Sequence, residues 1–214
     1  EGPLIVASNH PGAYDSLVIS SLIPRDDLKI ISSDIPFVKK LPGTREHMIF
    51  SDMDPHSRMG AARQALRHLK NGGALLVFAR ATMDPDPAYM PHAEIELTRW
   101  KSSLGLFLRN VPQTQVAVSI ISGVLSPRYL NHPSTLFRRG RVNKQRLSEF
   151  FQVMRQLMSP GEMMVTPQLT FGEALNLDEL GLPESKDINQ ITQAIINKAL
   201  EVFKIHQASF LSAQ

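Results

Sequence analysis

The chain has 214 residues, 43% of them apolar, which suits one globular domain with a substantial core and excludes an intrinsically disordered chain. Its 23 basic and 20 acidic residues leave a formal charge of +3, which is compatible with weak attraction to an anionic surface and does not indicate nucleic-acid binding. The absence of cysteine excludes disulfides, thiolate metal sites and an acyl-cysteine intermediate.

In the first half of the chain, short apolar runs alternate with helical patterns. Ala74–Phe78 is the clearest buried strand, because a continuous apolar run suits a parallel sheet that is covered on both faces. The longest helical pattern starts at Asp54-Pro55, with proline at the first helical position, and Gly72 and Gly73 follow its end. The pattern predicts strands over 4–7, 28–32, 48–51 and 74–78, and helices or helical turns over 16–23, 36–41 and 54–70.

The second half begins with a polar, proline-rich loop over 84–91 and continues the alternation. The pattern predicts helices over 94–109, 144–158 and 187–210, and strands over 116–124 and 163–171. The last helix starts with a capping box at Asp187 and Gln190, and its apolar stripe favours core packing over a membrane-surface role. The helix over 144–158 is amphipathic and carries its large apolar residues on one side: Leu147, Phe150, Phe151, Met154 and Leu157.

These elements predict a single α/β domain over residues 1–214, with a mostly parallel or mixed sheet of about six or seven strands flanked by helices. Because Glu1 directly precedes the first strand, we expect a further N-terminal segment, and a membrane anchor can lie there. A basic cluster at Arg138-Arg139-Gly140-Arg141, with Lys144 and Arg146 behind it, is typical of a solvated loop. A phosphate or lipid-headgroup patch is the alternative interpretation of this cluster.

A histidine and a carboxylate lie between the first strand and the first helix, in the segment Asn9-His10-Pro11-Gly12-Ala13-Tyr14-Asp15. Loops at strand ends hold reactive groups on a rigid sheet. Because His10 and Asp15 are five positions apart, their side chains cannot meet within one regular strand or helix. A turn at Pro11-Gly12 brings them together. His10 is then a candidate general base, and Asp15 the carboxylate that fixes its tautomer. A turn histidine bonded to the backbone is the competing interpretation.

The same spacing occurs at His47 and Asp52. That pair lies in a predicted strand with no turn residue between its members, so we expect the two side chains to diverge. With seven histidines in the chain, one chance match of this kind is unsurprising. We therefore exclude this second pair from the candidate site.

Residues 8–16 resemble the first motif of the glycerolipid acyltransferase superfamily, which acylates lysophosphatidic acid, glycerol 3-phosphate and related lysolipids. Residues 77–82, read Val-Phe-Ala-Arg-Ala-Thr, stand at a strand end where the family carries Phe-Pro-Glu-Gly-Thr-Arg. Residues 48–52 resemble the second motif, 116–119 the fourth, and 169–173 the late strand and its glycine turn. The resemblance extends from residue 3 to about 205, and the order and spacing of the motifs make it specific.

The third motif departs from the family pattern. Phe78 and Thr82 are retained, but the motif's Glu is Arg80, its Gly is Ala81 and its Arg is Met83. In the family these positions help to bind the phosphate of the acceptor, so the departure concerns acceptor recognition.

Two interpretations of the departure remain open. In the first, Arg80 replaces the lost cation together with Arg58, which follows the second motif, because an arginine fork suits phosphate. In the second, the acceptor is not lysophosphatidic acid, which the nearby Asp84 and Asp86 favour because they repel a phosphate. An ion pair between Arg80 and Asp84 is the purely structural interpretation.

The resemblance implies direct transfer of a fatty acyl group from acyl-CoA or acyl carrier protein to a hydroxyl of a lysophospholipid or glycerol-type acceptor. His10 is the general base and Asp15 orients it, while backbone N–H groups of the turn or an arginine stabilise the oxyanion. No metal and no other cofactor is required, and a peripheral contact with the cytoplasmic face of the membrane is expected. The residues expected to bind substrate are Phe78, Thr82, Arg80 and Arg58.

The alternative function is a catalytically weakened member of the same fold that binds lipid or acyl carrier protein without turnover. The altered third motif supports it, whereas the intact His10 and Asp15 oppose it. A serine esterase is disfavoured because the sequence contains no Gly-x-Ser-x-Gly elbow.

Overall fold

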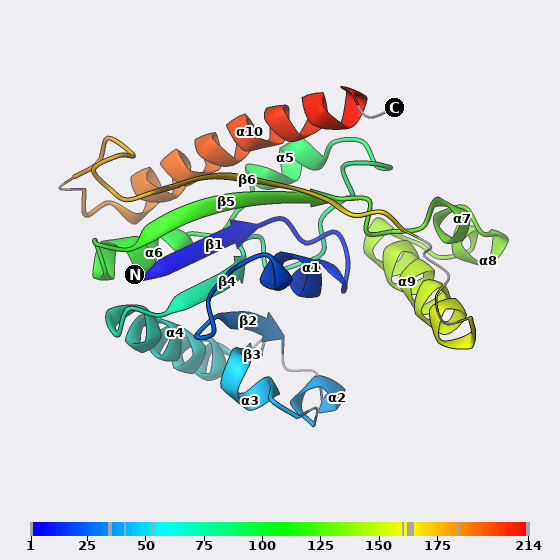
Figure 1. Ribbon diagram of the computed structural model, residues 1–214, viewed down its shortest axis with the longest axis horizontal. Helices are drawn as coiled ribbons and strands as arrows, with labels where there is room; N and C mark the ends of the chain where they lie inside the picture. The colour runs from blue at the N-terminus through cyan, green and yellow to red at the C-terminus, as the bar shows by residue number, and fades with distance from the viewer. Residues whose placement is uncertain are drawn as a thin grey trace.

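A computed structural model describes residues 2–212 except 34, 35, 41, 53, 160, 162–164 and 184. Its strands form one sheet in the order β3-β2-β4-β1-β5-β6 (Figure 1). They are β1 (Leu4–Ser8), β2 (Lys29–Ser33), β3 (Met48–Ser51), β4 (Ala74–Phe78), β5 (Gln115–Ser122) and β6 (Gln168–Leu175). Neighbouring strands are parallel except β5 and β6, which are antiparallel. The predicted α/β fold with a mostly parallel sheet is confirmed.

The described helices flank this sheet, and α4 follows the sequence signals closely, whereas α3, α7 and α8 were not predicted. Asp54 caps α4 by accepting a hydrogen bond from the Ser57 N–H at 2.9 Å, and Pro55 occupies the first helical position. No helix in the described part of the chain is long and apolar enough to cross a membrane. The helices are α1 (Asp15–Ser21), α2 (Pro36–Lys39), α3 (Thr44–His47), α4 (Pro55–Lys70), α5 (Ala93–Leu97), α6 (Ser103–Asn110), α7 (Pro127–Leu130), α8 (Pro133–Leu136), α9 (Arg141–Met158) and α10 (Ile188–Ser212).

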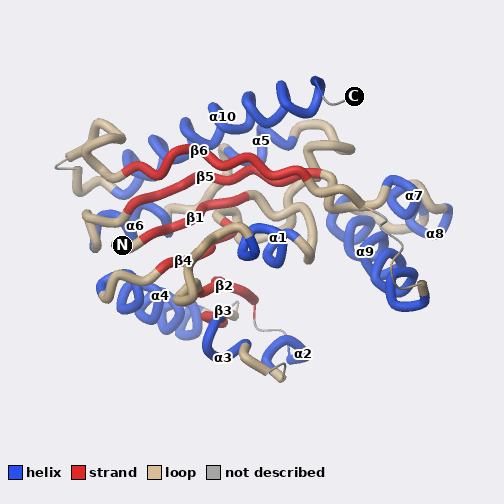
Figure 2. The backbone as a smooth tube through the Cα atoms, viewed as in Figure 1, coloured by secondary structure: helices blue, strands red, loops and turns tan. Residues whose placement is uncertain are grey.

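The two faces of the sheet carry separate parts of the core. On β1, Ile5 and Ala7 pack with residues of α4, α6 and α10, whereas Val6 packs on the opposite face with Ile19 of α1. This division follows from the alternation of side chains along a strand. Figure 2 shows α10 running along β5 and β6, against which it packs.

The topology places the turn after β1 at a crevice of the sheet. β1 lies between β4 and β5, so that Ser8 is level with Phe78 on one side and Ser119 on the other. The connection after β1 contributes α1 to one face, whereas the connection after β4 contributes α6 to the other. Where such connections diverge, the carboxyl ends of neighbouring strands open a crevice that commonly holds ligands. The His10 turn and the end of β4 meet at that point.

Two predicted elements differ from the structure. The single helix predicted over 94–109 is two helices, because the segment between α5 and α6 turns to bury Trp100 and donates the Lys101 N–H to Ala79 O at 2.8 Å. The strand predicted from residue 163 begins at Gln168, and residues 163 and 164 lie outside the described part.

The apolar side of α9 does not face the core, which is the largest difference. The buried residues of this helix are polar, namely Gln145, Ser148 and Gln152. Phe150 and Met154, predicted on the apolar side, are exposed. The physical reason is that Gln145 and Gln152 bond to loop backbone at the carboxyl edge of the sheet and so satisfy buried backbone groups there.

Candidate active site

His10 and Asp15 meet as the turn between them predicts. His10 Nδ1 lies 2.8 Å from Asp15 Oδ2, and the Gly12 N–H donates to the same oxygen at 3.1 Å. Asp15 is fully buried at the start of α1, while His10 is partly exposed. Within the described residues, His10 Nε2 has no hydrogen-bond partner. The ring is therefore oriented by a carboxylate and keeps its second nitrogen for a ligand.

A second carboxylate holds the backbone of the same turn. The His10 N–H donates to Asp84 Oδ2 at 2.8 Å, and the Asp84 N–H donates to His10 O at 2.7 Å. The His10 ring stacks on Phe78, with centroids 4.3 Å apart and planes 26° apart. These contacts tie the turn after β1 to the end of β4 and the loop behind it.

Buried charges shift the pKa values in this cluster. Burial lowers the pKa of His10, but the hydrogen bond to Asp15 and the charges of Asp15, Asp84 and Glu149 outweigh it, so that the net pKa is raised above 6.5. Burial raises the pKa of Asp84 to about 6, although the His10 N–H and the charges of Arg80, His10 and Arg141 oppose this. Perturbed groups in a crevice are typical of functional sites.

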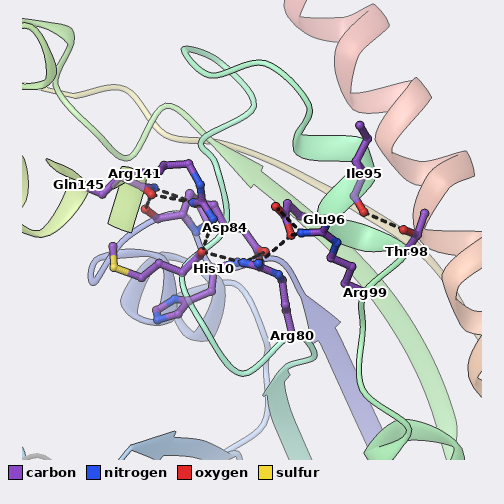
Figure 3. Close-up of polar contacts among 11 residues, drawn as sticks. His10, Arg80, Asp84, Ile95, Glu96, Thr98, Arg99, Arg141 and Gln145 are labelled. Atoms are coloured by element: carbon purple, nitrogen blue, oxygen red, sulfur yellow. Dashed lines mark hydrogen bonds and ion pairs between the residues drawn. The ribbon is translucent and has the colours of Figure 1, made fainter. Parts of the chain in front are cut away.

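Arg80 is ion-paired inside the protein (Figure 3). Its guanidinium lies 2.7 Å from Glu96 Oε2 and 3.4 Å from Asp84 Oδ1, and it donates to Met83 O at 2.9 Å. Its side chain is largely buried. The ion pair anticipated with Asp84 is thus present, and Glu96 of α5 adds a partner that the sequence did not indicate.

The other expected substrate residues lie at different places. Phe78 contacts the His10 ring, whereas Thr82 is exposed on the loop that follows β4. Arg58 is exposed in the first turn of α4, which follows the edge strand β3. β3 stands three strand positions from β1, or about 14 Å at the usual spacing. The structure therefore brings Phe78, but not Arg58, into contact with His10.

Asp86 is a structural residue. Its buried carboxylate accepts hydrogen bonds from the backbone N–H groups of Gly123, Val124 and Leu125 at 2.8, 3.0 and 3.2 Å, so it shapes the loop after β5. The expectation that Asp86 repels an acceptor phosphate therefore has no support from its contacts, which are all with backbone N–H groups.

The chance match at His47 and Asp52 is separated, as predicted. His47 ends α3 and approaches Leu28 O at 3.3 Å, while Asp52 follows β3. The extended residues Met48–Ser51 stand between them and span about 10 Å at about 3.3 Å per residue, which separates the two side chains.

Sequence reasoning missed the polar side of α9. Gln145 donates to Asp84 O at 2.7 Å and to Pro11 O at 3.2 Å, and Glu149 accepts the Ala13 N–H. Burial raises the pKa of Glu149, although the Ala13 N–H opposes the shift. The signal was present in the sequence, because polar residues recur at helical spacing just as the apolar residues do. These polar residues are Gln145, Ser148, Glu149, Gln152 and Gln156.

The N–H groups of the turn are largely committed to carboxylates. His10 donates to Asp84, Gly12 to Asp15 and Ala13 to Glu149. The expected oxyanion stabilisation by N–H groups of this turn therefore has no support from these three donors.

Two hollows lie near the sheet, and His10 lines neither of them. One of about 270 Å³ lies between β5, β6 and α10, and one of about 750 Å³ lies between the loop over 85–92 and the start of α9. Neither Phe78 nor Thr82, expected to bind substrate, lines either of them. Among the described residues, no cluster of three or more histidine, aspartate and glutamate side chains is arranged to hold a metal ion.

No protein-family model and no curated protein matches this chain.

Proposed function

We propose that the protein is an O-acyltransferase that moves a fatty acyl group from a thioester to a hydroxyl. The observation that carries this proposal is the bond of 2.8 Å between His10 Nδ1 and Asp15 Oδ2, which leaves Nε2 available at the carboxyl end of β1. A buried carboxylate on one imidazole nitrogen makes the other nitrogen a directed general base.

In this reaction, His10 Nε2 takes the proton of the acceptor hydroxyl while the oxygen attacks the thioester carbonyl. The tetrahedral intermediate then expels the thiolate, which receives the proton back from His10. Asp15 stabilises the imidazolium between the two steps. The donor is acyl-CoA or acyl carrier protein, and the acceptor is a lysophospholipid or a glycerol-type alcohol.

The backbone at the altered third motif supports a kinship with glycerolipid acyltransferases. Ala81 has a φ of 61°, in the left-handed region that favours glycine, and the family carries glycine at that position of the motif. A glycine would adopt this φ without strain, so the backbone at Ala81 is compatible with the glycine of the family's motif.

The surroundings of Arg80 bear on the acceptor. Its guanidinium already faces Asp84 and Glu96, so a phosphate would compete with two protein carboxylates for it. We propose that acceptor binding does not depend on a phosphate contact with Arg80, which favours an acceptor other than lysophosphatidic acid.

The test is thiol release from acyl-CoA by the purified protein, with mass spectrometry of the products. The acceptors are lysophosphatidic acid, other lysophospholipids and monoacylglycerol. We expect the His10→Ala variant to lose acyl transfer while its circular dichroism spectrum is unchanged, because only the proton acceptor is removed.

The matched control is His47→Ala, which removes a histidine with the same sequence relation to an aspartate, and it should retain wild-type turnover. Wild-type turnover in His10→Ala contradicts the proposal. If the wild-type protein binds acyl-CoA but releases no thiol with any acceptor, the binding-only alternative is favoured.

A further inference from the structure

The outward side of α9 is unusually apolar for a surface helix. Phe150, Met154, Leu157 and Met158 have exposed fractions of 57%, 41%, 71% and 74%, and together form what we call the α9 outer face. At about 100° per residue, these positions fall within a stripe about 100° wide. Large contiguous apolar surfaces of this kind mark interaction sites.

Contacts on the opposite side of α9 keep this face outward. Gln145, Glu149 and Gln152 bond to the loops after β1, β4 and β5, and Gln156 accepts the Tyr14 hydroxyl. A rotation that buried the apolar side chains would break all of these bonds. The exposed face is thus a fixed property of the fold.

Positive charge is concentrated around the same helix. The segment over 125–159 has seven basic residues and one acidic residue, in a chain whose total charge is only +3. The single acidic residue, Glu149, turns its carboxylate inward to the Ala13 N–H. Phe137, at the end of α8, is 87% exposed and directly precedes Arg138 and Arg139. The basic residues are Arg128, Arg138, Arg139, Arg141, Lys144, Arg146 and Arg155.

We propose that the α8–α9 surface docks on an anionic lipid bilayer. The α9 outer face enters the boundary between headgroups and acyl chains, and the basic residues beside it contact lipid phosphates. An apolar stripe flanked by arginine and lysine is what an interfacial helix requires, and neither feature alone gives stable attachment. This inference deepens the proposed function and rests on it for its role, because docking would place the protein at the membrane that holds a lipid acyl acceptor.

The position of α9 links docking to the candidate active site. α9 stands beyond the carboxyl edge of the sheet, beside α7 and α8 (Figure 1). Its polar side contacts Ala13 and Tyr14, which belong to the turn that carries His10. A bilayer on the outer face is therefore separated from the turn by the thickness of one helix, about 10 Å.

Co-sedimentation with vesicles tests the docking surface. The vesicles are phosphatidylcholine alone and phosphatidylcholine mixed with phosphatidylglycerol. We expect preferential binding to the anionic vesicles, weakened by salt. Leu157→Ser and Phe150→Ser should each reduce binding by about tenfold or more, because each removes a side chain whose transfer from water drives insertion. Arg138→Glu combined with Arg139→Glu should remove the preference for anionic lipid.

The matched control is Ile205→Ser on α10, because Ile205 is 58% exposed but lies away from the basic segment. It should bind vesicles as the wild type does. Equal binding to both kinds of vesicle, or wild-type binding by Leu157→Ser, overturns the docking surface. A third outcome also overturns the docking surface. In it, the protein binds no vesicles but forms a dimer, or a complex with acyl carrier protein, and Leu157→Ser abolishes that association.

Vesicle binding does not require turnover, so the two proposals fail separately. His10→Ala should bind anionic vesicles as tightly as the wild type. If it does while the wild-type protein transfers no acyl group, the proposed reaction is wrong and the docking surface stands.

Discussion

At the scale of the residue, the protonation state of His10 decides when the site can act as a base. The ring is surrounded by Asp15, Asp84 and Glu149, whose charges and hydrogen bonding outweigh burial and raise its pKa. A raised pKa means that the ring is protonated, and inactive as a base, at acidic pH. Activity should therefore rise with pH as the proton leaves Nε2.

The first prediction concerns this titration. The pH profile of kcat/KM should rise through an apparent pKa above 6.5, and nuclear magnetic resonance of the His10 ring should report a pKa in the same range. Asp15→Asn should lower that pKa, because the opposing effect of burial remains when the carboxylate charge is lost. It should also reduce kcat by about 10²–10⁴-fold, because the imidazolium and its tautomer lose their partner.

Asp52→Asn is the control for this prediction, since Asp52 stands in the same sequence relation to His47, with the strand β3 between them. It should leave the His10 titration unchanged. An Asp15→Asn variant with an unaltered His10 pKa would show that Asp15 does not control the base.

A second prediction concerns the strained residue of the third motif. Ala81→Gly should stabilise the protein by about 1 kcal/mol, because glycine adopts a φ of 61° without the steric cost that alanine bears. Chemical denaturation measures the change. Ala88→Gly is the control in a neighbouring loop; Ala88 lacks a positive φ, so the added chain entropy should destabilise the protein by about 0.4–1 kcal/mol.

At the scale of the element, α9 works as a clamp rather than as a cover for the core. A helix normally turns its apolar side inward, but here the loops after β1, β4 and β5 present backbone groups that need partners. Gln145 donates amide N–H groups to the loops after β1 and β4, whereas Gln152 donates to Val124 O and accepts from the Ser126 N–H in the loop after β5. The site is held by hydrogen bonds from outside the sheet.

The third prediction tests this clamp. Gln145→Ala should lower the free energy of unfolding by about 1–3 kcal/mol, because Asp84 O and Pro11 O lose a buried donor and Arg141 loses its amide acceptor. Urea denaturation measures the loss. Gln193→Ala is the control: Gln193 is exposed on α10 and bonds only to Asn197, so its removal should change stability by no more than about 0.5 kcal/mol. Equal changes in the free energy of unfolding for the two substitutions would show that the bonds of Gln145 do not stabilise the loops.

At the scale of the whole molecule, one close approach of two helices joins distant parts of the chain. A Cβ atom at Gly105 of α6 would overlap the Ile188 carbonyl oxygen of α10 and lie 2.5 Å from Thr192 Oγ1. α10 in turn packs on β5 and β6. The small residue therefore sets how closely the C-terminal helix covers the sheet.

Gly105→Ala should destabilise the protein by about 1–3 kcal/mol, because the packed helices must separate to admit the methyl group. The matched control is Gly60→Ala in α4, where nothing lies within 4 Å of the added atom. That substitution should stabilise the protein by about 0.5–1 kcal/mol, since alanine favours the helix. Thermal unfolding of both variants distinguishes the two effects at Gly105. Packing predicts a lower melting temperature for Gly105→Ala, whereas helix propensity predicts a higher one.

The sequence alone predicted five of the six strands of the sheet within two residues of their observed ends, and it also predicted the candidate base. The run Ala74–Phe78 and the turn at Pro11-Gly12 depend on residues adjacent in the chain, so their signals are local. Turn chemistry also separated His10 from His47, because a strand cannot bring residues five positions apart together. The break between α5 and α6 was missed, since it depends on Trp100 reaching the core and on a bond to Ala79.

Only the tertiary structure decided the orientation of α9 and the partners of Arg80. Both stripes of α9 have helical spacing, and the buried one is selected by unpaired backbone groups of loops far away in sequence. Arg80 had two acidic neighbours in sequence, but Glu96, which comes from the separate helix α5, forms its shorter ion pair. Hydrogen bonds and charges between distant segments depend on where the fold brings them, and no local pattern encodes that.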